Sequence, residues 1–474
     1  MSCNRSDPGH GASEVGTLAL SGAERVLQEC LGLHRGESLA LFYDETTRDC
    51  ADVVRSAAGR HGICLIERFV PLDDQVRAAV GDRLFDSDED ALERGRAILL
   101  CFAATLEATP YRKQLVKIGV RNGRLGTMPG ATLEVLAHAV NVDYSDALSR
   151  CSNLALAMLA GDNTILTSYV FDREGHPIDS RELRVRLAGR IPITSPGIIE
   201  NGTWGNLPGG ETFIAPMEAC ASGTFVLNGA FTGHVLRPWE PVFLHFERGN
   251  LLEIEGTCSH ADALRRMIKA GQNGGGPLGL AELGIGVNPG VGELRGNALF
   301  DEKKEGTVHV AVGDNSEYGG RLKARIHEDF ITSAPSLTID GRPILAEGRW
   351  VLREEDWREN HVRALELGHE LPEHFLVQRS GLEASEDAAG RLRVRRDVGA
   401  NRVCIYTVGT DALSSKLARV YRLLPEPPNF LRFGLLCEDY EANFGATNAG
   451  ALRGFLAVLV KQQLAAIREA DLDE

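Results

Sequence analysis

Two histidines and one carboxylate lie on segments that the sequence predicts to be β-strands. His309 lies in TVHVAVG (307–313), and His327 and Asp329 are two residues apart in IHEDF (326–330). Alternate side chains of a strand share a face, so an H-x-D pair can direct an imidazole and a carboxylate at one point. Two histidines and one carboxylate are enough to bind Zn²⁺, Mn²⁺ or Fe²⁺. The pattern predicts a divalent-metal site, although the H-x-D spacing alone has little specificity.

Two further carboxylates stand next to glycine-rich turns. Glu211 follows Gly209-Gly210, and Glu282 precedes Gly284-Ile-Gly286. Such glycines permit a positive φ and a close approach of the backbone. Three carboxylates with two imidazoles suit two nearby ions with one carboxylate bridging them, and a two-metal site can activate water and polarise a carbonyl together. Glu211 and Glu282 are therefore candidate metal ligands, and either is also a candidate general base.

The residues around His309 indicate how its strand is buried. In 307–313 the alternating valines predict one apolar face, and His309 is the one large polar group on the other face, between Thr307 and Ala311. The preceding DEK tripeptide (301–303) is interpreted as a solvated or salt-bridged turn, with a catalytic acid or base among its residues as the alternative. Trp204 is interpreted as packing a turn, with a place in a substrate pocket as the alternative.

The predicted secondary structure that must position these groups differs between the two halves of the chain. Short apolar runs at 38–43, 63–70 and 97–103 alternate with helical spacing at 47–60 and 111–120. This alternation predicts a parallel sheet with helices on both faces. From about residue 163 the runs are short and β-rich, with Gly, Pro and Asn between them, which is typical of antiparallel sheet.

The predicted fold class is therefore α/β, with four parts. They are a mobile tail at 1–17, an N-terminal doubly wound α/β domain at 18–160, a β-rich metal-binding catalytic domain at 161–345, and a C-terminal α+β extension of unknown role at 346–474. In the extension, RLRVRRD and RVCIYTVG are predicted strands. Its histidines His361, His369 and His374 are interpreted as a solvated helix face rather than a second metal site.

Composition limits the class of partner. The 474 residues contain 66 acidic and 51 basic side chains, giving a formal net charge of −15, which argues against nucleic acid as the main partner. No apolar run approaches the ~20 residues that span a bilayer, and the first twenty residues are unlike a signal peptide. Ten cysteines without a C-x-x-C spacing predict free thiols. We expect a soluble cytoplasmic enzyme with a small-molecule or short-peptide substrate and no membrane partner.

Four stretches together resemble a known family. They are NLPGGETFIAP (206–216), AELGIGVNPG (281–290), DEKKEGTVHVAVGDNSEYGG (301–320) and RIHEDFI (325–331). In this order they resemble the motifs of the aminopeptidase T group of metallo-aminopeptidases and its shorter relatives, over roughly residues 35–345. The resemblance implies a homodimeric peptidase with two ions, Zn²⁺, Mn²⁺ or Co²⁺. It implies as ligands Glu211, Glu282, His309, His327 and Asp329.

The chain departs from the aminopeptidases at one point. They carry a tyrosine shortly after the strand histidine, and Tyr318 does not fall at that spacing. Ring-cleaving 2,5-dihydroxypyridine dioxygenases share the fold and bind one Fe²⁺. They have a histidine at the position of Glu282 and lack the equivalents of Glu211 and His309, while they keep the H-x-D pair. The carboxylate-rich set in this chain favours the hydrolytic two-metal site.

Three functional hypotheses follow. The first is a metal-dependent amide hydrolase of aminopeptidase type, in which a metal-activated water attacks the carbonyl. The second is a mononuclear Fe(II) dioxygenase that opens an aromatic or heterocyclic ring. The third is a binding protein in which the metal has a structural role.

Overall fold

The computed structural model describes residues 8–352 except for 74–83, 105–108, 188–189, 191 and 273–274. Beyond residue 352 it describes 376–379, 383–386, 392–399, 402–407, 418–425, 431–444, 456, 459 and 465–468. His361, His369 and His374 lie outside the described residues. Residues 8–17, which the sequence assigns to a tail, form the start of helix α1 (Pro8–Arg25).

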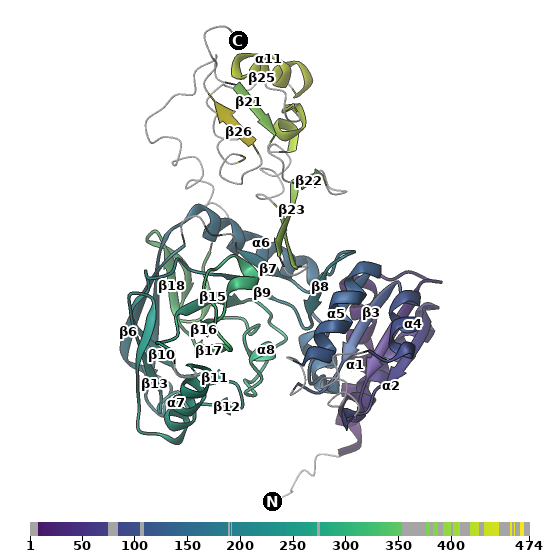
Figure 1. Cartoon of the computed structure of the whole chain (residues 1–474), viewed down its shortest axis with the longest axis horizontal. Helices are drawn as coiled ribbons and strands as arrows, with labels where there is room; N and C mark the ends of the chain where they lie inside the picture. The colour runs from purple at the N-terminus through teal and green to yellow at the C-terminus, as the bar shows by residue number, and fades with distance from the viewer. Residues whose placement is uncertain are drawn as a thin grey trace, which may run out of the picture.

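The N-terminal half is built on a five-stranded sheet in which every pairing is parallel (Figure 1). In spatial order its strands are β2 (Cys64–Phe69), β1 (Ser38–Tyr43), β3 (Ala97–Cys101), β4 (Arg124–Thr127) and β8 (Trp204–Asn206). The three central strands, β1, β3 and β4, are short, apolar and mostly buried, which is the condition under which parallel sheet is stable. The predicted parallel arrangement is confirmed.

Helices cover both faces of this sheet. The first face carries α1 and α2 (Arg48–His61), and the second carries α4 (Asp86–Arg94) and α5 (Pro110–Asn122). The alternating residues of β1 divide between the two layers, because Leu39 and Leu41 join the first and Ala40 and Phe42 join the second.

The last strand of the parallel sheet comes from a distant part of the chain. Strand β8 pairs with β4 through Leu125 and Trp204, although these residues are separated by helix α6 (Tyr144–Ala160) and by three strands. The sequence places the domain boundary at residue 160, so β8 belongs to the N-terminal sheet although it lies beyond that boundary in the chain. The chain returns to the N-terminal sheet before it enters the strand that carries Glu211.

The second half contains two antiparallel sheets. The eight-stranded sheet consists, in spatial order, of β14 (Asn250–Glu255), β13 (Val242–Glu247), β10 (Ser222–Leu227), β6 (Pro177–Arg186), β5 (Asn163–Phe171), β18 (Ser336–Ile339), β19 (Arg342–Ala346) and β20 (Arg349–Trp350). The seven-stranded sheet consists of β12 (His234–Val235), β11 (Ala230–Phe231), β17 (His327–Ser333), β16 (Thr307–Gly313), β15 (Leu280–Gly286), β9 (Glu211–Ile214) and β7 (Ile193–Ser195). Helix α7 (Ser259–Gln272) packs beside β14.

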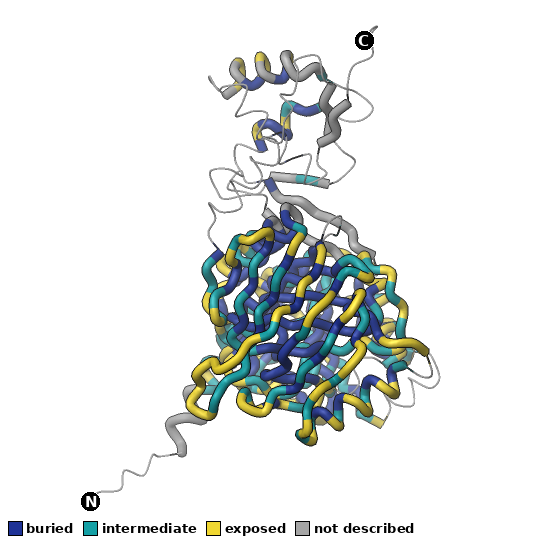
Figure 2. Tube along the Cα trace, turned by 90° about the vertical axis from the view of Figure 1, so that its left-hand side faces the viewer, coloured by how far each residue is buried: buried dark blue, intermediate teal, exposed yellow. Residues whose placement is uncertain are grey.

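One core lies between these two sheets, and the buried residues of their strands are dark blue in Figure 2. Val308, Val310 and Val312 of β16 belong to this core, together with Leu166 and Leu183 of the facing sheet. The predicted apolar face of the 307–313 segment is confirmed. Because side chains alternate, the other face of β16 is left for His309.

The described parts of the C-terminal region confirm an α+β extension. A three-stranded antiparallel sheet is formed by β22 (Glu383–Glu386), β23 (Leu392–Gly399) and β24 (Arg402–Thr407), as the two strand-like sequences predict. A second small sheet consists of β25 (Leu431–Arg432), β21 (Leu376–Arg379) and β26 (Ala465–Arg468), next to helix α11 (Phe433–Phe444). Strand β24 packs against α6 and β7, and β23 packs against the short helix η5 (Ser316–Tyr318).

Two global expectations concern thiols and membranes. The seven cysteines that the structure describes in full are free thiols, which agrees with the prediction. Within the described residues, no helix has the length and apolar character needed to cross a bilayer.

The glycines of the GIG motif allow two close approaches. Gly284 pairs with His309 across β15 and β16, and a Cβ atom at Gly284 would lie 2.0 Å from His309 Nε2. A Cβ atom at Gly286 would lie 2.2 Å from the carbonyl oxygen of Lys304. The predicted close approach of the backbone is therefore confirmed, and the imidazole lies directly over Gly284.

The fold generates a stability prediction at Gly284. Gly284→Ala forces His309 or the strand to shift, and we expect the free energy of unfolding of the metal-free protein to fall by about 1–3 kcal/mol. Urea denaturation followed by circular dichroism measures this change. Gly292→Ala is the control, because no atom lies within 4 Å of its added Cβ. Equal stability of the two variants would contradict the position of the imidazole.

Candidate metal centre

The five predicted ligands lie on four adjacent strands of the seven-stranded sheet. Glu211 begins β9, Glu282 lies in β15, His309 lies in β16, and His327 and Asp329 begin β17. The sheet order β17-β16-β15-β9 therefore places them side by side.

The strand register puts these residues on one face. Glu282 pairs with Ala311, and Ala311 pairs with Asp329, so the three form one row across β15, β16 and β17. The neighbouring row contains Gly284 and His309. Paired residues of antiparallel strands point to the same side. The small side chain of Ala311 and the absence of one at Gly284 leave room for the polar groups between them.

The polar side chains meet at Glu282. Its Oε1 lies 3.1 Å from His309 Nε2, and its Oε2 lies 3.3 Å from His327 Nε2. His327 Nε2 is also 3.4 Å from Asp329 Oδ1, and His309 Nε2 is 3.7 Å from Glu211 Oε2. The structure thus brings all five predicted residues together, with one oxygen of Glu282 directed to each histidine.

Two residues that were not predicted as ligands belong to the same group. Glu302 and Lys303 follow helix α8 (Ala298–Asp301), and they are only 6% and 1% exposed. The ammonium of Lys303 donates to Oε1 of Glu211 and to Oε1 of Glu302. The interpretation of this tripeptide as a solvated turn is therefore wrong, whereas its salt bridges are present. The sequence feature that could have identified Glu302 and Lys303 as site residues is their position immediately before the His309 strand.

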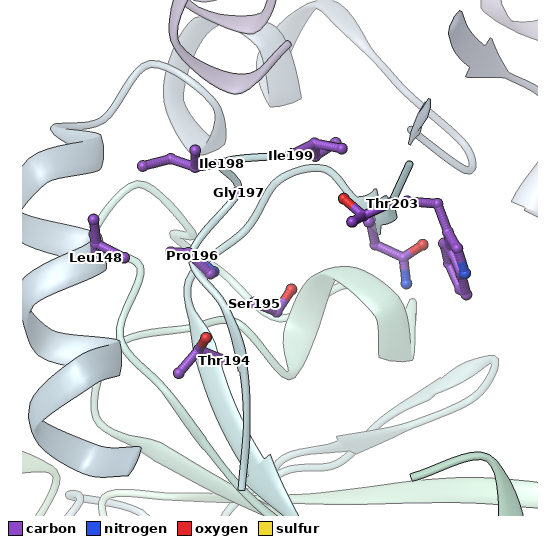
Figure 3. Close-up of a pocket in the computed structure, with 11 residues that line it drawn as sticks. Leu148, Thr194, Ser195, Pro196, Gly197, Ile198, Ile199 and Thr203 are labelled. Atoms are coloured by element: carbon purple, nitrogen blue, oxygen red, sulfur yellow. The ribbon is translucent and has the colours of Figure 1, made fainter. Parts of the chain in front are cut away.

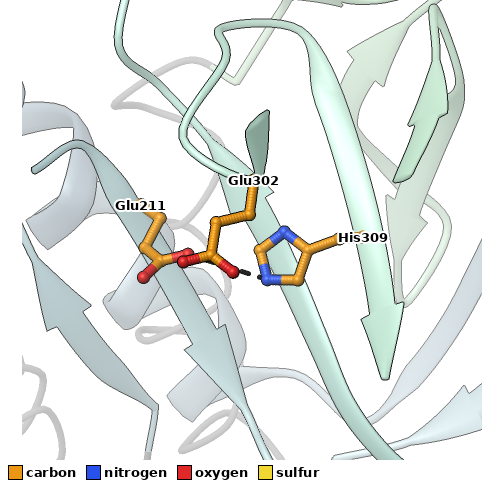
Figure 4. A group of neighbouring side chains, drawn as sticks. All are labelled: Glu211, Glu302 and His309. Atoms are coloured by element: carbon orange, nitrogen blue, oxygen red, sulfur yellow. Dashed lines mark ion pairs between the residues drawn. The ribbon is translucent and has the colours of Figure 1, made fainter. Parts of the chain in front are cut away.

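The donors form two adjacent clusters. Glu211, Glu302 and His309 converge in Figure 4, and Glu282, His327 and Asp329 form the second cluster. In each cluster the potential ligand atoms lie within 4.8 Å of one another.

This donor set fits divalent cations on two grounds. Glu211 Oε2 and Asp329 Oδ1 are buried without a hydrogen-bond partner in the described structure. With neutral imidazoles, the four carboxylates face one ammonium, so three negative charges remain in a buried site. Burying uncompensated charge is costly, and carboxylate oxygens with imidazole nitrogens are suitable ligands for Zn²⁺ and Mn²⁺.

Without a metal, protons compensate this charge. Burial alone would lower the pKa of His309, but the hydrogen bond to Glu282 and the nearby carboxylates outweigh it and raise the pKa to about 9. Burial likewise opposes the charged form of His327, yet Asp329 and Glu282 hold its pKa well above the ordinary value. Burial would raise the pKa of Glu282, and its hydrogen bonds to both histidines lower it far below the usual range.

The Lys303 side of the site is also strongly perturbed. Burial disfavours the ammonium, but the charges of Glu211 and Glu302 outweigh this effect and raise the pKa of Lys303. Burial, reinforced by the charge of Glu211, raises the pKa of Glu302 to about 8. Lys303 is therefore an internal cation that bridges the side chains of Glu211 and Glu302.

The orientation of His327 is set by a backbone group. Its Nδ1 donates to the carbonyl oxygen of Asp314 at 2.8 Å, because a carbonyl can only accept. This bond presents Nε2 to Glu282 and Asp329, as a metal-binding imidazole requires. Asn315 has a structural role, since its side chain donates to the carbonyl oxygen of Ala281 and accepts from the amide of Leu322.

A cavity of about 840 Å³ opens onto the clusters. Its walls include Glu211, Glu282 and Asp329 on the sheet, and Trp204 and Val116 from the N-terminal half. This volume lies within the range of small-molecule binding sites, about 300–1,000 Å³. Strand β7 and helix η5 also contribute lining residues, so the β23–β24 hairpin that packs against them lies beside the cavity. The interpretation of Trp204 as packing a turn is therefore replaced by the alternative, a place in the pocket wall.

A second pocket adjoins this cavity. It is lined by the loop from Thr194 to Ile199 and by Thr203 to Asn206, as Figure 3 shows, and its volume is about 50 Å³. Such a space holds one or two water-sized groups and is too small for a substrate. The larger cavity is the candidate substrate site.

Comparison with known proteins agrees with the predicted resemblance. Residues 181–352 match the model of the 2,5-dihydroxypyridine 5,6-dioxygenase family, and this range contains all five predicted ligands as well as Glu302 and Lys303. This part of the chain is therefore similar to the 2,5-dihydroxypyridine dioxygenases, one of the groups that its motifs resemble.

Individual relatives define the extent of the similarity. The 2,5-dihydroxypyridine 5,6-dioxygenase of Pseudomonas putida is 27% identical over 169 residues, which are 33% of this chain and 47% of that protein, so the match spans about half of the relative. The solved structure of 2,5-dihydroxypyridine dioxygenase from Pseudomonas putida has a TM-score of 0.53 at 20% identity and covers 72% of this chain and 99% of that one. The structure of wild-type AmpT from Thermus thermophilus has a TM-score of 0.49 at 18% identity and covers 71% of this chain and 99% of that one. The first of these structures shows the shared fold.

The raised pKa values generate a prediction for metal affinity. Below about pH 9, a metal ion must displace the proton of His309, and below about pH 8 that of Glu302 as well. The affinity for Mn²⁺ should therefore rise with pH, by at least about tenfold per unit between pH ~6.5 and ~8.5. Isothermal titration calorimetry in two buffers of different ionisation enthalpy measures both the affinity and the protons released. An affinity that is independent of pH in this range would contradict the protonated metal-free site.

Proposed function

We propose that this protein is a metal-dependent hydrolase that cleaves an amide bond in a small molecule or short peptide, in the manner of an aminopeptidase. The observation that carries the proposal is the position of Glu282 between two clusters of donors. One of its oxygens faces His309 and the other faces His327, at 3.1 and 3.3 Å. A carboxylate so placed is suited to bridge two ions, and four carboxylates favour hard divalent ions such as Mn²⁺, or Zn²⁺ and Co²⁺.

The residues of the two clusters would hold these ions. Glu302 and His309 serve one position, His327 and Asp329 serve the other, and Glu282 is shared. Divalent ions bound here supply a Lewis acid for the amide carbonyl and lower the pKa of a coordinated water.

Glu211 is the candidate proton acceptor in this proposal. Lys303 donates to its Oε1, its Oε2 is buried without a hydrogen-bond partner in the described structure, and the residue lines the cavity. A carboxylate fixed at one oxygen and unsatisfied at the other can take the proton of the attacking water at Oε2. It can then pass this proton to the leaving amine, which is general acid–base catalysis by one residue.

A test separates the ligand from the base. The wild-type protein, purified without a His tag and incubated with Mn²⁺ or Zn²⁺, should retain about two equivalents of metal by inductively coupled plasma mass spectrometry. Glu211→Gln should keep the metal and lower kcat for dipeptide hydrolysis by about 10²–10⁴. Glu282→Gln should lose metal as well as activity.

The control is Glu240→Gln, which removes an exposed carboxylate outside the clusters and should change neither quantity. Loss of metal in Glu211→Gln would assign Glu211 as a ligand rather than the base. A wild-type protein that binds no metal under any of these conditions would end the proposal.

A ring-cleaving Fe(II) dioxygenase is the second candidate, and the family match over residues 181–352 favours it. The H-x-D pair with one further ligand resembles the minimal set for a mononuclear iron site with open positions. The reactions differ in their need for O₂. Anaerobically loaded Fe²⁺ protein that consumes O₂ with 2,5-dihydroxypyridine, at about one equivalent of iron, would favour the dioxygenase. Amide hydrolysis under argon would favour the hydrolase.

A further inference from the structure

The cavity wall contributed by helix α5 is cationic. Arg112, Lys113 and Lys117 of this helix line the cavity, and Arg325 adds a fourth cation from the segment before β17. Lys113 and Lys117 are one helical turn apart and so lie on one face of α5. Neither lysine forms an ion pair with another described residue.

The position of these cations is locally unfavourable for the helix. Helix α5 begins at Pro110 after the N-cap Thr109, and it has no acidic residue in its first turn. Positive side chains near a helix N-terminus oppose the macrodipole, at a cost of about 0.3–1 kcal/mol each at low ionic strength. Arg112 and Lys113 are placed against this preference, and departures of this kind concentrate at functional sites.

Arg112 is held rigidly in the wall. It is 8% exposed, and its Nη2 donates to Thr127 Oγ1 at 3.2 Å. Thr127 in turn donates to Asn206 Oδ1 at 2.7 Å, and the guanidinium lies over the ring of Trp204 at 5.0 Å. The guanidinium of Arg112 is therefore preorganised beside Trp204, whereas Lys113 and Lys117 are exposed on the same helix.

The acidic groups of the cavity gather at the opposite, metal-binding side. Four of them are the carboxylates of the two clusters, whose three uncompensated negative charges would be more than offset by the four positive charges of two divalent ions. The remaining two are Asp314 and Glu317, and the side chain of Asp314 accepts hydrogen bonds from Ser316 and Ala324. In the metal-loaded protein, the α5 wall would then be the side of the cavity that attracts anions.

We propose that the α5 wall, with Lys113 and Lys117 on its face and Arg112 beneath, binds a carboxylate of the substrate. This inference rests on the proposed function and names its substrate class: small amides that carry a free carboxylate away from the scissile bond. The volume of about 840 Å³ accommodates a molecule that reaches from the metal side to this wall.

A binding experiment tests the subsite without relying on turnover. The probes are N-acetylglycine and N-acetylglycinamide, which differ only in the carboxylate, and the protein is the full chain loaded with Mn²⁺. Calorimetry should show that the wild type binds N-acetylglycine more tightly than N-acetylglycinamide. The double variant Lys113→Met/Lys117→Met should bind it about tenfold more weakly, with unchanged affinity for the amide.

The matched control is Arg173→Met/Lys269→Met, which removes the same charge from exposed positions outside the cavity and should behave as wild type. Equal affinity of N-acetylglycine for wild type and the Lys113/Lys117 variant would overturn the subsite, even in a protein that hydrolyses amides. A protein that shows this difference but hydrolyses no dipeptide would retain the subsite and lose the hydrolase assignment.

Discussion

Four carboxylates buried beside one another repel, and the arrangement of the site follows from how this repulsion is balanced. Lys303 is the permanent counter-charge, because it is fully surrounded by protein and joins Glu211 to Glu302. Replacing one member of such a buried group leaves the others uncompensated, which costs far more than the pair contributes. The remaining negative charge is left for bound cations or for protons on the histidines and Glu302.

The polar groups can lie this close together because neighbouring positions of the sheet carry a small side chain or none. Gly284 lies beneath the ring of His309, and Ala311 separates Glu282 from Asp329 within one row. The opposite face of the same strands contributes Leu283, Ile285, Val308, Val310, Val312 and Phe330 to the core between the two antiparallel sheets. One face therefore supplies rigidity, and the other supplies ligands that are held in place before any ion binds.

Sequence patterns predicted the parallel and antiparallel halves and the strands of the site, because period-two alternation and glycine turns are local properties. The face of His309 followed from the valines of its own strand. The burial of Glu302 and Lys303 could not be read in the same way, since charged residues in a turn are normally solvated and only the tertiary structure closes around them. The place of Trp204 in the parallel sheet was likewise hidden, because that pairing joins segments far apart in the sequence.

Strand β8 has a consequence for how substrates are selected. The chain leaves the antiparallel half at β7, adds β8 to the edge of the parallel sheet, and returns to β9 within a few residues. A hinge rotation that separated the two halves would have to pull β8 away from β4. The β4–β8 pairing therefore holds the two walls of the cavity together. The width of the cavity is therefore set by the pairing of β8 with β4, not by a free hinge between the two halves.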